Sequence, residues 1–271
     1  MADPSEPMTT LVAQTMRAVG FLSRLPVSQR YFEAGGPSPA MRDDTAGFAL
    51  AGVVIAAAPA LLLLVLSTIG VPPFMAAVFC ILALIAATGA LHEDGLGDVA
   101  DGFGGGHTKD ERLEIMKDSR IGTYGAIAIA GSILLRSAAL AVMVQAHGAF
   151  AAGLGLIAVA ACSRAAMVWF WAGLPNARPG GVADAAGKPS ENAVGTAAIS
   201  GLAIFAILAV ASAGFVNAAI AILLALTALQ GFSRFCTRMI GGHTGDTLGA
   251  CQQIVEITLF TGLALGISIP N

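Results

Sequence analysis

Long apolar runs alternate with shorter polar segments along this chain. The first run extends from Thr45 to Leu91 and contains no Asp, Glu, Lys, Arg or His in 47 residues. Later runs cover about 124–173, 193–233 and 251–269. Turn-forming residues divide the first three runs near Gly70, Gly148 and Gly214, and each half could cross a hydrocarbon core of about 30 Å as a helix. The pattern therefore predicts an all-α, polytopic integral membrane protein with about seven transmembrane helices.

The first 43 residues have a different pattern. Arginines alternate with apolar side chains up to Leu25, which predicts an amphipathic helix lying on the membrane and broken at Pro26. Residues 28–44 are rich in proline, glycine and polar residues and favour a loop. The first ten residues are acidic and lack the basic region of a cleaved signal peptide. We therefore expect one membrane-embedded catalytic domain over residues 1–271, with 1–43 as its interfacial, cytoplasmic N-terminal segment.

Composition supports a lipid bilayer as the partner. The chain is 56% hydrophobic and 11% charged, whereas an average soluble domain is about 25% charged. So few charges cannot cover a globular surface. The net charge is −3 and no run of lysines and arginines occurs, so a nucleic-acid partner is excluded. The cysteines lack the spacing of a disulfide framework or a zinc site and are expected to be small buried residues.

The placement of basic residues tests the number of crossings. With seven crossings, 12 of the 14 lysines and arginines lie on the same side as the N-terminus. The other two, Arg136 and Arg164, lie inside predicted spans, where Arg136 could snorkel toward the interface. The positive-inside rule then predicts a cytoplasmic N-terminus. Polar segments 92–123, 174–192 and 234–250 would face the same compartment and could converge on one site, with 92–123 as a cytoplasmic catalytic loop.

An acidic, glycine-rich segment follows the first apolar run directly. Asp94, Asp98 and Asp101 are spaced i, i+4 and i+7, so a helix would place all three carboxylates on one face. Two carboxylates about 6 Å apart repel by roughly 3 kcal/mol at an effective dielectric of 20. Either protonation or a hard divalent cation such as Mg²⁺ or Mn²⁺ would relieve that repulsion. The alternative is a solvated acidic loop that only connects two helices.

Two further segments carry candidate chemistry. Thr108 and Glu111 have the spacing of a capping box, which predicts a helix over about 109–118 with basic residues suited to phosphate oxygens. The sequence from Gly241 to Ala250 combines a glycine-rich turn with the start of a helix, which offers backbone N–H groups to an anion. Ordinary juxtamembrane charge explains the first segment equally well, and a flexible loop explains the second. Arg164 could contact a phosphate or a carboxylate, or form a structural salt bridge.

Together these segments resemble the cobalamin synthase family, the adenosylcobinamide-GDP ribazoletransferases. The matching stretches are Arg24–Val27, His92–Gly102, Leu113–Thr123, Ser163-Arg164 and Gly241–Ala250. The sequence departs from the family pattern at Gly97 and Ala49, and the loop 175–192 is only loosely similar.

The resemblance implies the last assembly step of cobalamin biosynthesis, catalysed in the bacterial cytoplasmic (inner) membrane with the active site on the cytoplasmic side. α-Ribazole or its 5′-phosphate would displace GMP from adenosylcobinamide-GDP, giving adenosylcobalamin or its 5′-phosphate. Mg²⁺ is the implied cofactor, and a homo-oligomer is left open.

The candidate residues follow from the motifs and this chemistry. Breaking a pyrophosphate needs charge neutralisation, which metals held by carboxylates supply. The predicted catalytic residues are Asp94, Asp98, Asp101 and His92. The predicted metal ligands are Asp94, Asp98, Asp101, Asp118 and Asp246. The predicted substrate-binding residues are Arg112, Lys117, Arg120, Thr123, Arg164, His243 and Thr244.

Two other functions remain open from the sequence. Asp98, Asp101 and Gly102 resemble the start of the CDP-alcohol phosphotransferase motif, but the Ala-Arg pair and the later aspartates of that motif are missing. A transporter would carry polar groups near the middle of the membrane, whereas the charges here cluster on one side. Neither a serine-hydrolase nor a nucleotide-binding fingerprint is present.

Overall fold

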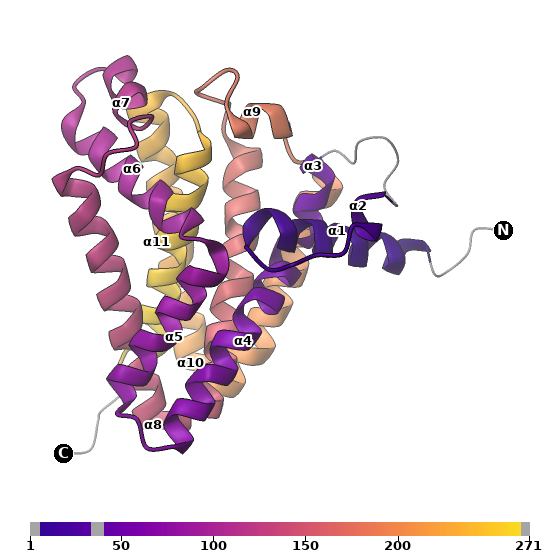
Figure 1. Ribbon diagram of the computed structural model, residues 1–271, viewed down its shortest axis with the longest axis vertical. Helices are drawn as coiled ribbons and strands as arrows, with labels where there is room; N and C mark the ends of the chain where they lie inside the picture. The colour runs from indigo at the N-terminus through magenta and orange to yellow at the C-terminus, as the bar shows by residue number, and fades with distance from the viewer. Residues whose placement is uncertain (1–5, 34–40, 267–271) are drawn as a thin grey trace.

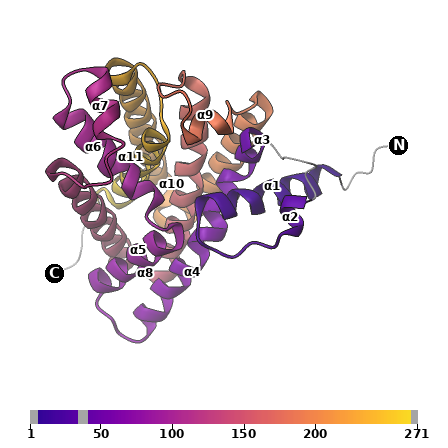
Figure 2. The ribbon, with the colours of Figure 1, turned by 45° about the horizontal axis from the view of Figure 1, so that its top comes forward.

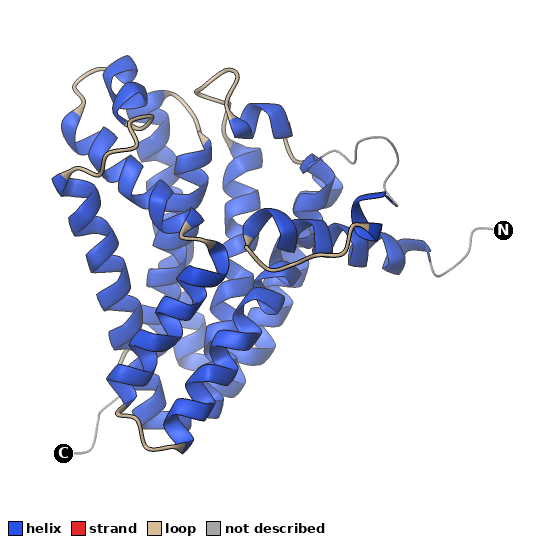
Figure 3. Ribbon diagram, viewed as in Figure 1, coloured by secondary structure: helices blue, strands red, loops and turns tan. Residues whose placement is uncertain are grey.

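The protein is a bundle of long helices with shorter helices gathered at one end (Figure 1). A computed structural model describes residues 6–33 and 41–266. Within these residues no strand is present, and an isolated bridge joins Asn176 to His243 (Figure 3). The all-α prediction is confirmed.

The helices in chain order are α1 (Glu6–Leu22), α2 (Arg30–Glu33), α3 (Met41–Asp44), the 3₁₀ turn η1 (Thr45–Gly47), α4 (Phe48–Thr68), α5 (Pro73–Thr88), α6 (Leu91–Gly105), α7 (Lys109–Ile115), α8 (Thr123–Gly173), α9 (Val182–Ala186), α10 (Glu191–Ile240) and α11 (Gly245–Ala264). The predicted turn between α4 and α5 near Gly70 is confirmed. The predicted capping box is also confirmed, since Thr108 and Glu111 bond each other's backbone at the start of α7.

Helices α8 and α10 each turn back at one glycine. Gly148 has φ 82° and ψ 161°, and Gly214 has φ 83° and ψ 166°, a conformation that side chains disfavour. Across the first break, Met143 packs against Gly155. Across the second, Leu202 and Leu226 line one cavity. The breaks lie where the sequence predicted them, so each element is a pair of helices.

The apolar helices make this a membrane protein. In the described part of the chain, three helical segments are long and apolar enough to cross a membrane, namely Met41–Thr68, α8 and α10. The pair α5 and α6 would be a fourth, although it is bent by 91°. Helix α8 has 51 residues, which is about 76 Å of helix and more than twice a hydrocarbon core. The number of about seven crossings stays a prediction.

The polar segments meet at one end of the bundle, where α6, α7, α9 and the start of α11 lie together (Figure 2). The backbone N–H of His243 donates to the carbonyl of Pro175 at 2.9 Å, and that of Ala177 donates to the carbonyl of His243 at 2.8 Å. Arg112 on α7 donates to the carbonyl of Met239 at the end of α10. The predicted convergence is therefore confirmed. Most of the segment 92–123 forms α6 and α7, and its role as a cytoplasmic catalytic segment stays a prediction.

A sharp bend places α6 at the polar end. Gly89 and Ala90 adopt left-handed conformations with φ 63° and 58°, so the chain changes direction between α5 and α6. The glycine-rich sequence favours a loop over a helix, but packing against α11 and α7 stabilises α6. Helix α6 therefore lies at the polar end of the bundle, beyond the long apolar helices. It carries Asp94, Asp98 and Asp101.

The N-terminal helix lies across the bundle and projects to one side (Figure 1). Helix α1 ends at Leu22, before Pro26, as the sequence predicted. Buried Arg17 on α1 forms an ion pair with Asp44 on α3, with a shortest distance of 2.6 Å. The predicted loop 28–44 is partly wrong, since α2 and α3 lie within it, and residues 34–40 are outside the described residues. Contact of α1 with the membrane surface stays a prediction.

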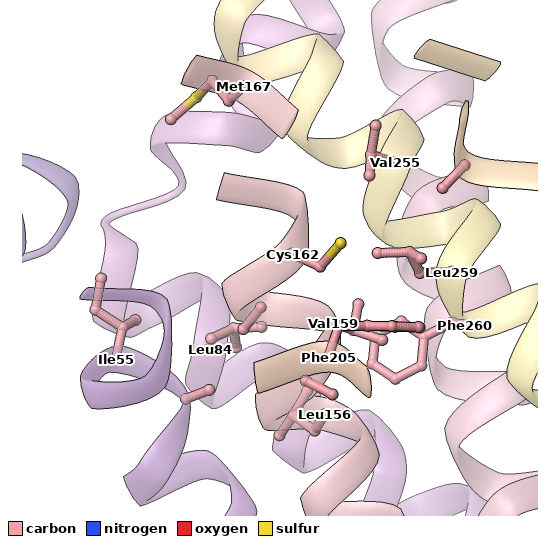
Figure 4. Packing of buried hydrophobic residues seen from close by; sticks show 14 of the residues in the cluster. Ile55, Leu84, Leu156, Val159, Cys162, Met167, Phe205, Val255, Leu259 and Phe260 are labelled. Carbon is pink, nitrogen blue, oxygen red and sulfur yellow. The ribbon is translucent and has the colours of Figure 1, made fainter. Parts of the chain in front are cut away.

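Aromatic and aliphatic side chains fill the centre of the bundle. Phe205 of α10 meets Val159 of α8 and Phe260 of α11 there (Figure 4). Small residues allow closer contact elsewhere, since a Cβ at Gly52 would overlap the carbonyl of Ala160 and separate α4 from α8. The four cysteines are free and buried, as predicted: Cys80, Cys162, Cys236 and Cys251.

A buried ionic network joins three helices inside this apolar core. Arg136 of α8, which is 1% exposed, donates to Glu93 of α6 at 2.9 Å and to Glu256 of α11 at 3.0 Å. Gln253 donates to Glu93 at 3.1 Å and accepts from Ser132 at 2.7 Å. The snorkelling suggested for Arg136 is wrong, because its charge is paired inside the protein.

We predict that Gly52→Ala destabilises the protein by about 1–3 kcal/mol, because the added methyl group overfills the contact between α4 and α8. The melting temperature in detergent would fall. Gly131→Ala is the matched control, since no atom of another part of the chain lies within 4 Å of its Cβ position. It should leave the melting temperature unchanged or raise it, because alanine favours a helix by roughly 0.5–1 kcal/mol over glycine. Equal effects of the two substitutions would contradict the prediction.

We also predict that Arg136→Met destabilises the protein by about 3–5 kcal/mol, because it leaves two buried carboxylates unpaired. The folded yield and the melting temperature in detergent measure this loss. The triple variant Arg136→Met, Glu93→Gln, Glu256→Gln should recover most of the loss, since it removes the buried charges together. A single variant as stable as the wild type would show that the network is dispensable.

Candidate active site

Four carboxylates gather at the polar end of the bundle. Asp94, Asp98 and Asp101 lie on α6, whose helical geometry confirms the predicted shared face. Asp246 joins them from the first turn of α11. Asp98 is surrounded by the other three, each of which acts on its charge. Residues separated by about 150 positions in the sequence thus form one acidic cluster, which we call the carboxylate cluster.

Glycines bring α6 and α11 close enough to form this cluster. A Cβ at Gly95 would lie 2.6 Å from the carbonyl oxygen of Asp246. A Cβ at Gly249 would lie 3.2 Å from the Cα of His92. Both distances are shorter than ordinary contacts, so larger residues would separate the two backbones. The glycine density of the acidic segment therefore has a packing cause.

The carboxylates destabilise one another's charges. Burial, together with Asp94, Asp246 and Asp101, raises the pKa of Asp98 to about 7. Burial also raises the pKa of Asp246, although the nearby guanidinium of Arg178 opposes that shift. A cation bound here would remove part of this repulsion.

Arg178 is a site residue that sequence reasoning missed. Its Nη1 lies 3.0 Å from a carboxylate oxygen of Asp246, and its Nη2 donates to the carbonyl of Leu113 at 3.2 Å. It lies in the loop between α8 and α9, which has no periodic pattern and only a loose family resemblance. Only the folding of this loop over α11 places it beside the carboxylate cluster.

Asp101 has a different role from its neighbours on α6. Its carboxylate accepts hydrogen bonds from the backbone N–H groups of Gly122, at 2.7 Å, and Gly125, at 2.9 Å. These groups belong to the first turn of α8, where Gly122 has no side chain to cap the helix. Asp101 therefore substitutes for the missing cap and has less capacity left for a metal ion than Asp94 or Asp98.

Asp118 does not join the carboxylate cluster. It forms an ion pair of 2.6 Å with Arg120, and the hydrogen bond from Arg120 lowers the pKa of Asp118 to about 2. Asp118 is not among the groups that act on the charge of Asp98. The predicted metal-ligand role of Asp118 therefore has no support from its position, because Asp118 lies outside the cluster and pairs with Arg120 at the surface.

The predicted substrate-binding arginines are mostly committed to the fold. Arg112 donates to the carbonyls of Gly106, His107 and Met239 and thereby joins α7 to α10. Arg164 is 1% exposed and donates to the carbonyl of Ala160 at 3.0 Å. These contacts favour structural roles for both guanidinium groups over phosphate binding.

The other predicted substrate-binding residues fall into two groups. Lys117 and Thr123 are exposed at the polar end. His243 is 4% exposed and lies beside the ring of Trp171, with 6.4 Å between ring centroids. Thr244 caps α11 through the backbone N–H of Thr247, and its hydroxyl also reaches Asp246. Thr244 thus helps to position a member of the carboxylate cluster.

The carboxylate cluster has the donor chemistry of a magnesium site. Its donors are carboxylate oxygens, which hard divalent cations prefer. In the parts of the chain that the structure describes, no three His, Cys, Asp or Glu side chains are arranged so that they could hold a metal ion. The carboxylate donors therefore fit Mg²⁺ by their chemistry, although no three of them are arranged around one metal position.

An apolar pocket opens beside the carboxylate cluster. His92, Asp94 and Asp246 line it together with apolar residues that include Met167 and Trp171. His92 is 2% exposed, and its Nε2 has no hydrogen-bond partner. The site therefore combines a charged part with an apolar part.

Comparison with known proteins agrees with this architecture. The sequence profile described as cobalamin-5-phosphate synthase matches residues 14–264. A protein of Brucella anthropi named adenosylcobinamide-GDP ribazoletransferase is 43% identical over 258 residues, which cover 95% of this chain and 98% of the relative. Proteins of Brucella ovis and Brucella canis with the same name are 44% identical over 257 residues, again covering 95% of this chain and 98% of each relative. No solved structure matches the chain. On this similarity over nearly its whole length, the chain belongs to the cobalamin-5-phosphate synthase family.

Proposed function

We propose that this protein transfers α-ribazole, or its 5′-phosphate, to adenosylcobinamide-GDP and releases GMP. The products are adenosylcobalamin, or its 5′-phosphate, and GMP. The observation that carries the proposal is the carboxylate cluster around Asp98, at the polar end of a membrane-embedded bundle. The names of the Brucella relatives, 43–44% identical to this chain, supply the substrates.

Mg²⁺ is the proposed cofactor. Two of the three carboxylates of Asp94, Asp98 and Asp246 would hold it together with substrate phosphates. When bound, it would neutralise the negative charge of the pyrophosphate. Arg178 holds Asp246 through their ion pair, and Asp101 stabilises the start of α8. The ligand set is therefore narrower than the sequence predicted, because Asp118 is paired elsewhere and Asp101 is engaged by backbone N–H groups.

The reaction needs no nucleophile from the protein. A ribose hydroxyl of the ribazole attacks the phosphorus joined to cobinamide, and the bond from that phosphorus to the oxygen bridging to GMP breaks. A carboxylate that the metal leaves free would accept the proton of the hydroxyl. Asp94, the exposed carboxylate of the cluster, is the proposed acceptor when it is not bound to the metal, with His92 as the alternative. Lys117, Arg120 and Thr123 are exposed at the polar end, where they could meet substrate phosphates.

The proposed location is the cytoplasmic (inner) membrane, with the active site facing the cytoplasm. The asymmetric distribution of lysine and arginine supports that orientation. A CDP-alcohol phosphotransferase would use similar chemistry, and a transporter would move substrate without changing it. Incubation of the purified protein with adenosylcobinamide-GDP and α-ribazole, followed by the mass of the product, separates these functions. Uptake into proteoliposomes without GMP release would contradict the proposal.

We predict that Asp98→Asn lowers kcat/KM at least a thousandfold, because the central carboxylate of the cluster loses its charge. The melting temperature should stay the same or rise, since repulsion with Asp94, Asp101 and Asp246 is relieved. GMP release and thermal unfolding in detergent measure the two effects. Asp110→Asn is the matched control, because Asp110 is exposed on α7, outside the cluster, and should retain activity. An active Asp98→Asn variant would contradict the metal-ligand assignment.

Removal of divalent cations tests the cofactor separately. We predict that chelation abolishes GMP release and that added Mg²⁺ or Mn²⁺ restores it, because both ions prefer oxygen donors. Zinc should restore little activity, since the cluster offers no sulfur or imidazole ligand. Full turnover in the presence of excess chelator would contradict a divalent cofactor.

A further inference from the structure

The apolar pocket beside the carboxylate cluster is a built cavity of about 200 Å³. Phe48, Met167 and Trp171 are 0%, 3% and 2% exposed, so packing fixes its walls. Ala183 and Ala186 of α9 also line it. The charged side chains that line it, Asp94 and Asp246, also belong to the carboxylate cluster. A molecule in this pocket would therefore have its polar end at the proposed site of reaction.

The chemistry of the walls restricts what can occupy the pocket. Most of the lining residues are aromatic or aliphatic, so the pocket suits a flat apolar ring system. A flat base with a hydrocarbon edge would bury that edge against Phe48, Met167 and Trp171. The carboxylates in the lining, Asp94 and Asp246, belong to the proposed site of reaction, so they would meet the ribose of the same molecule.

We propose that this pocket binds the aromatic base of the ribazole and that α9 sets the size of base that is accepted. The assignment rests on the proposed function and identifies which of the two substrates uses the pocket. The base lies among Phe48, Met167 and Trp171, and its ribose extends toward Asp94. Ala183 and Ala186 leave the space that the second ring of the base occupies.

Enlarging a pocket wall tests the assignment. Ala186→Leu should raise KM for α-ribazole at least tenfold and leave KM for adenosylcobinamide-GDP within twofold of the wild type. The same variant should lower the ratio of kcat/KM for a benzimidazole riboside to kcat/KM for a one-ring imidazole riboside at least tenfold. Ala185→Leu is the matched control, because Ala185 lies on the same helix, is exposed and does not line the pocket. It should behave as the wild type.

Direct binding gives a readout that does not depend on turnover or on a pocket variant. The chain has two tryptophans, and Trp169 is 53% exposed and does not line this pocket. In a Trp169→Phe protein, α-ribazole alone should change the fluorescence of Trp171 in a saturable manner, and GMP alone should not. Ala186→Leu in the same background should weaken this binding at least tenfold.

The possible results distinguish a failure of the pocket assignment from a failure of the proposed function. Failure of the wild type to release GMP would overturn the proposed function. An active wild type in which Ala186→Leu matches Ala185→Leu would overturn the pocket assignment alone. Equal losses for the benzimidazole and imidazole ribosides, or a fluorescence response of Trp171 to GMP but not to α-ribazole, would overturn it as well.

Discussion

The buried charge of Arg136 is the interaction on which the arrangement of this protein depends. A guanidinium inside an apolar bundle is costly unless its charge is paired, and Glu93 and Glu256 pair it from two different helices. This contact ties α6 and α11 to α8. Because Glu93 directly precedes Asp94 on α6, the same contact determines where the acidic face of α6 points. Helix α6 therefore contributes Glu93 to the buried ionic network and Asp94 to the candidate active site.

The cluster shows a division of roles among similar side chains. Asp101 stabilises the start of α8, and Asp246 is positioned by Arg178 and Thr244. Asp98 is left among like charges, which raises its pKa to about 7. Such a group favours a bound cation because its own neighbours destabilise the ionised form. Asp98 and Asp101 belong to the same segment of sequence, but they have different partners. Asp101 is engaged in the fold, whereas Asp98 is available for chemistry.

The position of the site at the polar end explains how a membrane protein can act on charged substrates. In the proposed function, the phosphates would stay near exposed Lys117 and Thr123, and an apolar group would enter the pocket. The carboxylate cluster lies at the boundary between these two environments. A reaction that joins a flat aromatic nucleoside to a pyrophosphate-linked partner suits a site with this division.

The sequence by itself determined the helical class, the glycine breaks at Gly148 and Gly214, the capping box at Thr108 and the convergence of the polar segments. These features depend on local composition, backbone preference and charge asymmetry, which can be read from neighbouring residues. The sequence also placed Asp94, Asp98 and Asp246 among the candidate residues. Its family resemblance was confirmed over nearly the whole chain.

Only the tertiary structure decided which residues act together. Arg178 comes from a loop without a pattern, and Arg136 proved to be paired rather than snorkelling. Asp118 proved to lie outside the cluster, paired with Arg120 at the surface. The acidic segment is a helix despite its glycines, because those glycines allow α11 to pack closely against it. Partners separated by many residues are selected by packing and by the need to neutralise buried charge, and neither is visible in local sequence.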